Sequence, residues 1–449
     1  MVVPRFPSKE EHNRYLEKFK INQSRAMFTI ILSILVDSLG YSLVLPLLPG
    51  IAREFGASNL MIGILIASNA LSALICAPFW GKLSDKYGRK PILLISQIGT
   101  GVSFLVLGLS NSYYIILLAR ILDGIFGGQI PVIRAYVTDI TTPQTRASYM
   151  GKFMVGYTVG MIAGPSIGGF LGVINWRYPP FLTSSLSILS IILTVKVIAE
   201  SMPKERREEI KAQILIAQKN PEDKGSIWNK EVILRLSQTF LTSLISFMFT
   251  TSAPLVLSDR YGADASIIGS VMAIAGIGLL IYGIILMKPL IRKIGEKNIL
   301  ITAFIILIVI FFLYPYLSNL WMFYIFVLPF AFCVAFMRPL ISANIAKAAD
   351  PLKQGTVSGW AVNLQSLAQI IAPLISTGFL EIRGVAIGFV DLNSYELIGF
   401  TSVLCAIILF IIGYTDLKIH PNLYLYEKLR RKKEEIQKRK TRSGRNYSN

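Results

Sequence analysis

The sequence predicts an all-α membrane protein with twelve transmembrane helices in two pseudo-symmetric six-helix bundles. Apolar residues make up 53% of the chain and charged residues only 16%, well below the charged share of soluble proteins. The chain also holds twelve apolar stretches of about 20 residues, the length that crosses a bilayer as a helix. A basic loop near residue 85 recurs near residue 292, at the same place in the second half. Duplicated halves of this kind are typical of secondary transporters.

The twelve apolar stretches set the expected domain organisation. The expected spans are 26–48, 60–80, 91–110, 113–137, 149–172, 178–198, 230–257, 266–287, 298–317, 320–346, 354–380 and 394–417. They divide the chain into an N-terminal tail 1–25, a first bundle 26–198, a linker 199–229, a second bundle 230–417 and a basic tail 418–449. The linker sequence KERREEIKAQILIAQ mixes charges with an apolar face, which predicts an amphipathic surface helix.

The positive charge lies on one side of the expected membrane. The chain carries 45 Lys and Arg against 26 Asp and Glu, a net charge of +19. With the polar N-terminal tail in the cytoplasm and the spans alternating, the cytoplasmic segments sum to +19 and the outer loops to −1. This pattern predicts that both termini are cytoplasmic, at a plasma or inner membrane. The tail 418–449 is expected to attract anionic lipids rather than nucleic acid.

The repeated loop reads GKLSDKYGRKP at Gly81–Pro91 and KPLIRKIGEKN at Lys288–Asn298. We expect the shared glycine to take a backbone turn closed to other residues, and the cations to keep the loop on one side of the membrane. Identities at an offset of 207 residues are Leu83 with Leu290, Lys86 with Lys293, Gly88 with Gly295, and Lys90 with Lys297.

The second copy differs in charge. Arg292 stands at the position of Asp85, and Glu296 at the position of Arg89. The second half is therefore expected to lock through different pairs. A later loop follows an offset of 208 residues, which aligns Pro143 with Pro351 and Gly151 with Gly359.

Several classes of function are excluded by missing chemistry. The cysteines Cys76, Cys333 and Cys405 all fall inside spans, where they are expected to pack as small apolar residues. The histidines His12 and His420 lie in the tails, so no metal site is expected. No phosphate-cradling motif and no grouped nucleophile, base and orienting residue appear. We therefore expect neither an enzyme nor a bound cofactor.

Span 1 carries an acid, Asp37, about 16 Å from its cytoplasmic end at 1.5 Å per residue. An ionised carboxylate facing lipid at this depth would cost several kcal/mol, so we expect it to face the bundle interior. It is then either a proton-coupling group or a structural hydrogen-bonding group between helices.

Span 4 carries three charges, Arg120, Asp123 and Arg134, at near-helical spacing. Arg120 and Asp123 are one turn apart and able to pair, and Asp123 matches the depth of Asp37. Two acids and an arginine in one region of low dielectric constant couple their titrations, so a proton can be exchanged for a substrate charge. Arg134 is either part of this set or an arginine that reaches the cytoplasmic surface.

Span 5 carries a stripe of small residues along one helix face. Gly156, Gly160, Gly164 and Gly168 recur every four residues, and Pro165 interrupts the helix among them. Such a stripe lets a neighbouring backbone approach closely.

The remaining candidates for the substrate path are polar groups inside later spans. Arg338 is the one charge well inside a second-half span, and it either lines the path or reaches the cytoplasmic surface. With Arg120, the expected cavity residues are Gln129, Gln238, Arg338, Asn363, Gln365 and Gln369.

These motifs together resemble the major facilitator superfamily. GKLSDKYGRKP resembles its loop signature, and Arg120 followed by Gly124 resembles its RxxxG element. GxxxGPxxGG at Gly160–Gly169 resembles the span-5 element of proton-driven antiporters. LVDSLGYSLVLPLLPG and AYVTDITTPQTRA resemble the twelve-span drug:proton antiporters, especially the tetracycline-efflux type.

The resemblance implies roles for individual residues. Asp85 and Arg89 would form a charge network with Asp139 and the start of span 11, closing the cytoplasmic side in the outward-facing state. Asp37 and Arg120 would take proton-coupling and cavity roles. The implied gate consists of Gly81, Asp85, Gly88, Arg89, Asp139 and Arg146, and the span-5 element of Gly156, Gly160, Gly164, Pro165, Gly168 and Gly169.

The sequence thus predicts a monomeric carrier that exports a small organic compound, mostly apolar or cationic, in exchange for protons. Two alternatives remain open. One is a facilitator or symporter for a sugar or organic acid, with Arg120 and Arg338 binding an anion. The other is a transporter-like receptor or scaffold that acts through its basic tail and linker.

Overall fold

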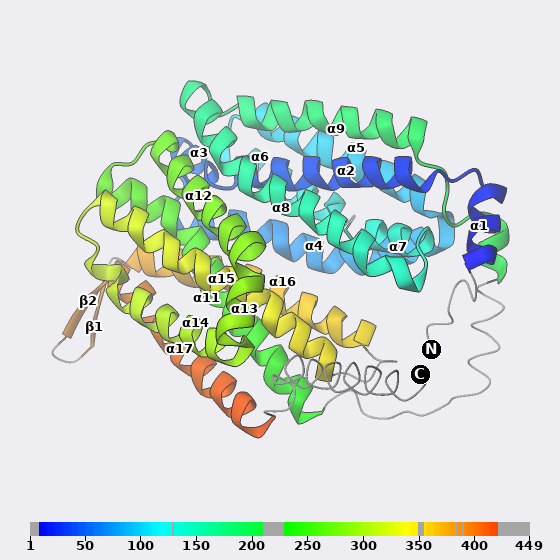
Figure 1. Ribbon diagram of the computed structural model, residues 1–449. Coiled ribbons are helices and arrows are strands. Elements are labelled where there is room, and N and C mark those ends of the chain that lie inside the picture. The colour runs from blue at the N-terminus through cyan, green and yellow to red at the C-terminus, as the bar shows by residue number, and fades with distance from the viewer. Residues whose placement is uncertain are drawn as a thin grey trace, which may run out of the picture.

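The computed structural model describes residues 9–127, 130–209, 229–348, 354–382, 384–387 and 390–420. In Figure 1 most helices of the first half, α2 to α9, lie above those of the second half, α11 to α17, while α12 lies beside α8, and most helix axes run lengthwise across the molecule. The expected helical two-bundle architecture is confirmed. Most of the amphipathic linker helix and nearly all of the basic tail lie outside the described residues.

The first half contains nine helices among the described residues. They are α1 (Lys9–Lys18), α2 (Gln23–Val44), α3 (Leu48–Glu54), α4 (Asn59–Tyr87), α5 (Arg89–Gly108), α6 (Tyr113–Phe126), α7 (Ile130–Asp139), α8 (Pro143–Ile174) and α9 (Tyr178–Val197). Expected span 4 is made by α6 and α7 together.

The second half repeats this pattern with three additions, a π-helical turn, a 3₁₀ turn and a hairpin. Its elements are α11 (Lys230–Tyr261), α12 (Ala265–Leu280), the π-helical η1 (Ile281–Leu286), α13 (Met287–Ile294), α14 (Glu296–Leu313), the 3₁₀ turn η2 (Tyr314–Tyr316), α15 (Leu320–Ala348), α16 (Gln354–Ile382), β1 (Gly384–Ile387), β2 (Val390–Asn393) and α17 (Ser394–Ile419).

Eleven spans of the described structure are long and apolar enough to cross a membrane. The twelfth expected span corresponds to α16, which has 29 residues but more polar side chains than the others. It packs between α4 of the first half and α11 of the second. Because protein surrounds it on two sides, a polar helix is tolerated here without facing lipid.

The β1–β2 hairpin was not expected. Its strands pair antiparallel, with Gly384 opposite Asn393 and Ile387 opposite Val390. Asn393 then starts α17 through a capping box: its side chain accepts from the backbone N–H of Glu396, and the Glu396 carboxylate accepts from the backbone N–H of Asn393. The connection between α16 and α17 thus contains a short folded element next to a capped helix.

The two basic loops share one backbone conformation. Gly88 has φ 108° and ψ 162°, and Gly295 has φ 90° and ψ 150°. Each glycine ends one helix and starts the next. These positive φ angles are rare for residues with a side chain, so the repeated glycine reflects a repeated turn.

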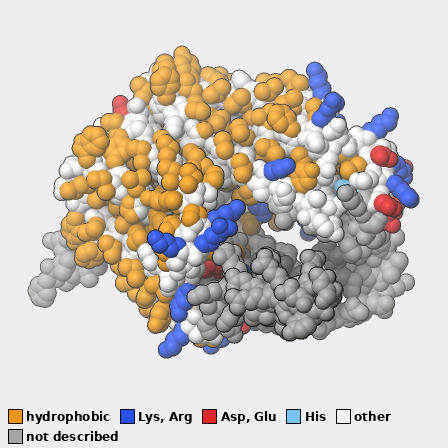
Figure 2. Space-filling model, viewed as in Figure 1, with side chains coloured by type: hydrophobic (Ala, Val, Ile, Leu, Met, Phe, Trp, Pro, Cys, Tyr) orange, Lys and Arg blue, Asp and Glu red, His pale blue; other side chains and the backbone are white. Residues whose placement is uncertain are grey.

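The exterior is apolar over the spans. Phe170 and Trp321 are 69% and 77% exposed, although both lie within long helices. In Figure 2 hydrophobic side chains cover much of the visible surface, and Lys and Arg lie mainly toward the right and lower parts of the view. So large an exposed apolar surface is stable only against lipid.

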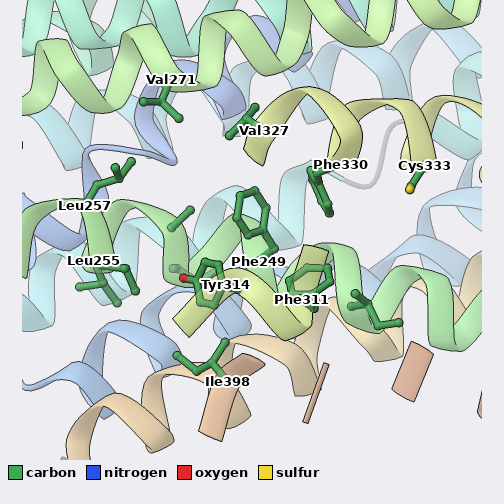
Figure 3. Packing of buried hydrophobic residues seen from close by; sticks show 14 of the residues in the cluster. Phe249, Leu255, Leu257, Val271, Phe311, Tyr314, Val327, Phe330, Cys333 and Ile398 are labelled. Carbon is green, nitrogen blue, oxygen red and sulfur yellow. The ribbon is translucent and has the colours of Figure 1, made fainter. Parts of the chain in front are cut away.

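Aromatic side chains fill much of the second-half core. The Phe249 ring lies 4.4 Å from that of Phe330, with Phe311, Tyr314 and Phe326 within 6.1 Å, measured between centroids. Figure 3 shows several of these rings converging between helices. This cluster ties α11, α14 and α15 into one unit.

The two halves touch at one end and at mid-height. We call the end with β1, β2 and α3 the hairpin end, and the opposite end, with Gly88, Asp139 and Gly295, the basic end. At the hairpin end Arg53 pairs with Asp259, and the Asn59 amide donates to the Leu380 carbonyl at 3.2 Å. At the level of Gln369, its amide joins the halves again by donating to the Tyr41 hydroxyl at 2.9 Å.

The glycine stripe of α8 faces α2. A Cβ added at Gly160 would lie 2.7 Å from the Leu35 carbonyl oxygen, and one at Gly164 would lie 2.8 Å from the Leu43 backbone nitrogen. Ser42 uses the close approach, since its hydroxyl donates to the Gly160 carbonyl at 2.9 Å. The helices α2 and α8 therefore pack backbone to backbone and act as one rigid pair.

We expect Gly164→Ala to destabilise the protein by about 1–3 kcal/mol, because the new methyl group has no room against α2. Gly151 lies on the same helix with no atom within 4 Å of an added Cβ. Gly151→Ala is the matched control and should be neutral or stabilising, since alanine favours helix. Thermal melting in detergent checks this, and equal melting temperatures for the two variants would contradict the packing account.

Candidate functional site

A cavity of about 180 Å³ lies mostly within the first half and reaches α16 of the second. It combines two carboxylates with amide, hydroxyl and apolar groups in the middle of the spans. Its lining is Ile34, Asp37, Ser38, Tyr41, Asn69, Ala73, Thr100, Asp123, Gly124, Gly127, Ile130, Tyr157, Met161 and Gln369. The two acids placed at similar depth by the sequence therefore share one chamber.

Asp123 is held by a buried ion pair on α6. Its Oδ2 accepts from Arg120 Nη1 at 2.8 Å and from the Asn69 amide at 2.9 Å. Asn69 also donates to the Arg120 carbonyl at 3.3 Å, so α4 is tied to α6 at this point. The helical spacing of three residues brings the two charges onto one face.

Tyr41 connects this ion pair to the second half. The Arg120 guanidinium lies 5.4 Å from the centroid of the Tyr41 ring, a cation–π contact. The Gln369 amide of α16 donates to the Tyr41 hydroxyl at 2.9 Å. The Tyr41–Gln369 hydrogen bond therefore links the charges of Asp123 and Arg120 to a contact between the halves.

Asp37 differs from Asp123 in having an open bonding position. Its Oδ2 is buried without a hydrogen-bond partner among the described residues, and so are Nε and Nη2 of Arg120. Asp37 lines the cavity, and Arg120 lies buried beside it against Asp123. A carboxylic acid in such a cavity can bind a ligand, and can also take up or release a proton.

The other expected cavity residues are distributed differently. Gln129 lies outside the described residues. Gln238 is not among the residues that line this cavity: it is buried in the second half, where its amide donates to Asp416 at 3.3 Å beside the buried Arg235–Asp416 ion pair. Asn363 and Gln365 lie on α16 toward the basic end and are not among the cavity-lining residues.

The arginines Arg134 and Arg338 are exposed near the basic end of the cavity. Arg338 stacks on Phe247, with 5.6 Å between the guanidinium carbon and the ring centroid. Of the residues predicted for the substrate path, the structure brings Asp37, Arg120, Asp123 and Gln369 together.

The signature loop forms a charge cluster inside the first half. The buried Arg89 donates to Asp139 at 3.1 Å and to Ser84 at 2.6 Å, and it pairs with the exposed Asp85 at 2.7 Å. Gly81 has open space beside it, and Arg146 is half-buried, with a buried Nε that lacks a hydrogen-bond partner in the described residues.

A further acid, Glu200, joins this cluster. It accepts from the backbone N–H groups of Arg89 and Lys90, at 2.8 and 3.0 Å. An anion at the first turn of α5 complements the helix dipole. The contact of Asp85 with the start of span 11, implied for the outward-facing state, stays a prediction.

The second half contains a charge-reversed counterpart. Glu296, at the position of Arg89, pairs with Lys347 at 3.2 Å. Lys347 stands 208 residues after Asp139, so the same two positions carry the same interaction with opposite signs. The Glu296–Lys347 pair agrees with the expectation that the second half locks through pairs different from those of the first half.

Two residues of the site were missed by sequence reasoning, Asn69 and Tyr41. Asn69 is a polar residue in the middle of an apolar span, which was a usable signal. Nothing in the sequence distinguished Tyr41 from a packing aromatic residue. For metals, no group of three or more His, Cys, Asp or Glu side chains able to hold an ion occurs among the residues that the structure describes.

Comparisons with known proteins agree with this architecture. The family described as Major Facilitator Superfamily matches residues 30–373. The chain is 29% identical over 364 residues to the class H tetracycline resistance protein of Pasteurella multocida, covering 78% of this chain and 88% of that protein.

A second relative and a solved structure extend the comparison. The quinolone resistance protein NorA of Staphylococcus aureus (strain COL) is 25% identical over 80% of this chain and 91% of its own length. A bacterial homologue of the human lysosomal transporter Spinster, solved in an inward-facing and occupied conformation, has a TM-score of 0.68. It is 15% identical, and the match covers 90% of this chain and 97% of that one.

We expect Asp139→Asn to lower stability by about 3–5 kcal/mol, because it leaves the buried Arg89 without its buried counter-charge. The matched control is Glu296→Gln, which breaks the partly exposed pair at the equivalent place and should cost no more than about 1 kcal/mol. Melting curves of both variants in one detergent provide the measurement. A larger loss for Glu296→Gln would refute this ranking.

Proposed function

The chain belongs to the Major Facilitator Superfamily of membrane transporters, and on that premise we propose that it exports a small organic compound in exchange for protons. The observation that carries the proposal is the shared cavity of Asp37 and Asp123, with Arg120 beside them. Ionisable groups inside a membrane are costly, and they commonly mark proton and substrate pathways.

The arrangement of the halves supports alternating access. The basic end is assigned to the cytoplasm by its Lys and Arg residues. In the described structure Arg53 pairs with Asp259 and Asn59 donates to Leu380 at the hairpin end, which supports a conformation closed toward the outside. The Arg89 and Glu296 pairs stay within their own halves and leave each half free to move as a unit.

Proton exchange follows from the different surroundings of the two acids. Asp123 is ionised while it pairs with Arg120. Asp37 has no such partner, and it takes up a proton when the cavity opens to the acidic side. A substrate that enters from the cytoplasm occupies the cavity beside Asp37, where its apolar body and the proton exclude each other, so substrate binding displaces that proton to the cytoplasm. Its release then reverses the exchange.

The names of the relatives support export of a drug-like compound. We propose a monomer in the plasma or inner membrane with both termini in the cytoplasm. The basic tail would lie against anionic lipid.

We expect Asp37→Asn to abolish transport driven by a pH gradient while changing stability by less than about 1 kcal/mol, since its Oδ2 has no partner to lose. Asp123→Asn should abolish this transport and also destabilise by about 3–5 kcal/mol, because it breaks a buried pair. Proteoliposomes with an acidic lumen, given labelled tetracycline or norfloxacin, test both variants.

The matched control for these variants is Glu54→Gln, which removes an exposed acid at the hairpin end and should transport normally. Uptake of both compounds by the unmodified protein that ignores the pH gradient would overturn proton exchange. So would full gradient-driven uptake by Asp37→Asn.

A further inference from the structure

Two arginines near the cavity carry no counter-charge. Arg89, Arg120 and Arg235 are each paired with an acid. Neither Arg134 nor Arg338 has a carboxylate oxygen within 4.0 Å in the part of the chain that the structure describes. Unpaired cations within a transmembrane bundle are energetically unfavourable, and those that are present commonly mark a substrate or ion pathway.

Both arginines lie on helix faces that belong to the substrate path. Ile130 of α7 lines the cavity, and Arg134 follows it by four residues, on the same face one turn nearer the basic end. The offset of 208 residues that relates Asp139 to Lys347 places Arg338 of α15 at the position of Ile130. The pseudo-symmetry therefore turns Arg338 toward the same central space from the other half, and both side chains are exposed.

Aromatic residues surround the two guanidinium groups. Tyr157 of α8 lines the cavity and interacts electrostatically with both Arg134 and Arg338. Phe247 of α11 lies against Arg338. Two cations, a phenol and a phenyl ring, contributed by four helices, thus stand at the basic-end opening of the cavity.

Arg338 lies deeper in the membrane than an arginine that only reaches the cytoplasmic surface would need to. Arg134 lies five residues before the end of α7, about 8 Å along the axis, which is within reach of the membrane surface. Arg338 lies ten residues before the end of α15, about 15 Å along the axis, and its guanidinium is held on Phe247.

We propose that the exported compound carries an organic acid group, a carboxylate or sulfonate on an apolar body, and that Arg134 and Arg338 bind it from the two halves. A guanidinium presents paired N–H donors that match such an oxyanion, and the neighbouring rings suit an apolar body. This inference rests on the proposed export function and names its substrate class.

Because each half contributes one arginine, a bound anion also favours closure of the basic end. Both arginines interact with Tyr157 from different halves, so closure of the basic end without the anion would bring two like charges toward each other. A bound anion offsets that repulsion and bridges the halves. Substrate binding therefore favours the closure that precedes release on the other side.

The test is equilibrium binding to the purified full chain in detergent, with 2-naphthoate and 2-naphthamide as probes of equal shape and different charge. We expect the unmodified protein to prefer naphthoate. Arg134→Gln and Arg338→Gln should each weaken naphthoate binding about tenfold and leave naphthamide binding unchanged. The lysine variants should retain part of the preference. Arg292→Gln, at an exposed arginine of α13, is the matched control and should behave as the unmodified protein.

The inference is overturned if the unmodified protein binds the two probes equally or binds neither. It is equally overturned if glutamine variants that keep the melting temperature of the unmodified protein weaken both probes alike, since the arginines then contribute nothing specific to the negative charge. Gradient-driven uptake of tetracycline or norfloxacin is measured separately. Persistent uptake without anion preference removes the inference alone, whereas anion preference without gradient-driven uptake removes proton exchange alone.

Discussion

The buried pairing of Arg120 with Asp123 is the interaction on which the rest of the site depends. Two charges removed from water are tolerated only when they pair closely and find further hydrogen bonds. Asn69 and Tyr41 supply those contacts from α4 and α2, and Gln369 extends them to α16. Asp123, Asn69, Tyr41 and Gln369 therefore form one wall of a polar chamber within apolar helices. Asp37 faces that chamber.

The helix packing around this chamber distinguishes contacts that stay fixed within one half from contacts along which the two halves can move. The glycine stripe fixes α8 against α2, and Gly169 lies against Gly269 of α12 at the contact between the halves. Small residues on both sides of that contact allow one backbone to shift along another with little side-chain interlocking. The charge clusters at the basic end, by contrast, are satisfied inside each half. Relative motion of the halves therefore leaves the most costly charges paired.

Much of this arrangement is predictable from the sequence because the membrane imposes simple rules. The spans follow from length and hydropathy, the repeated turn at Gly88 and Gly295 from identical spacing, and the inward position of Asp37 from the cost of a charge in lipid. The contacts of Glu200 and Gln238 were not predictable. They depend on which helix ends meet in space, and a polar residue near a helix end has many possible partners. The hairpin 384–393 was missed because short strands outside the membrane carry little periodic signal.

The central claim is that Asp37 changes its protonation when substrate occupies the cavity. Infrared difference spectroscopy of the reconstituted protein, recorded with and without tetracycline, observes this directly through the C=O stretch of a protonated carboxyl group. The account predicts a carboxyl band that is lost when the compound binds and is missing from the Asp37→Asn spectrum. A difference spectrum without any carboxyl band, or one unchanged by Asp37→Asn, would contradict it.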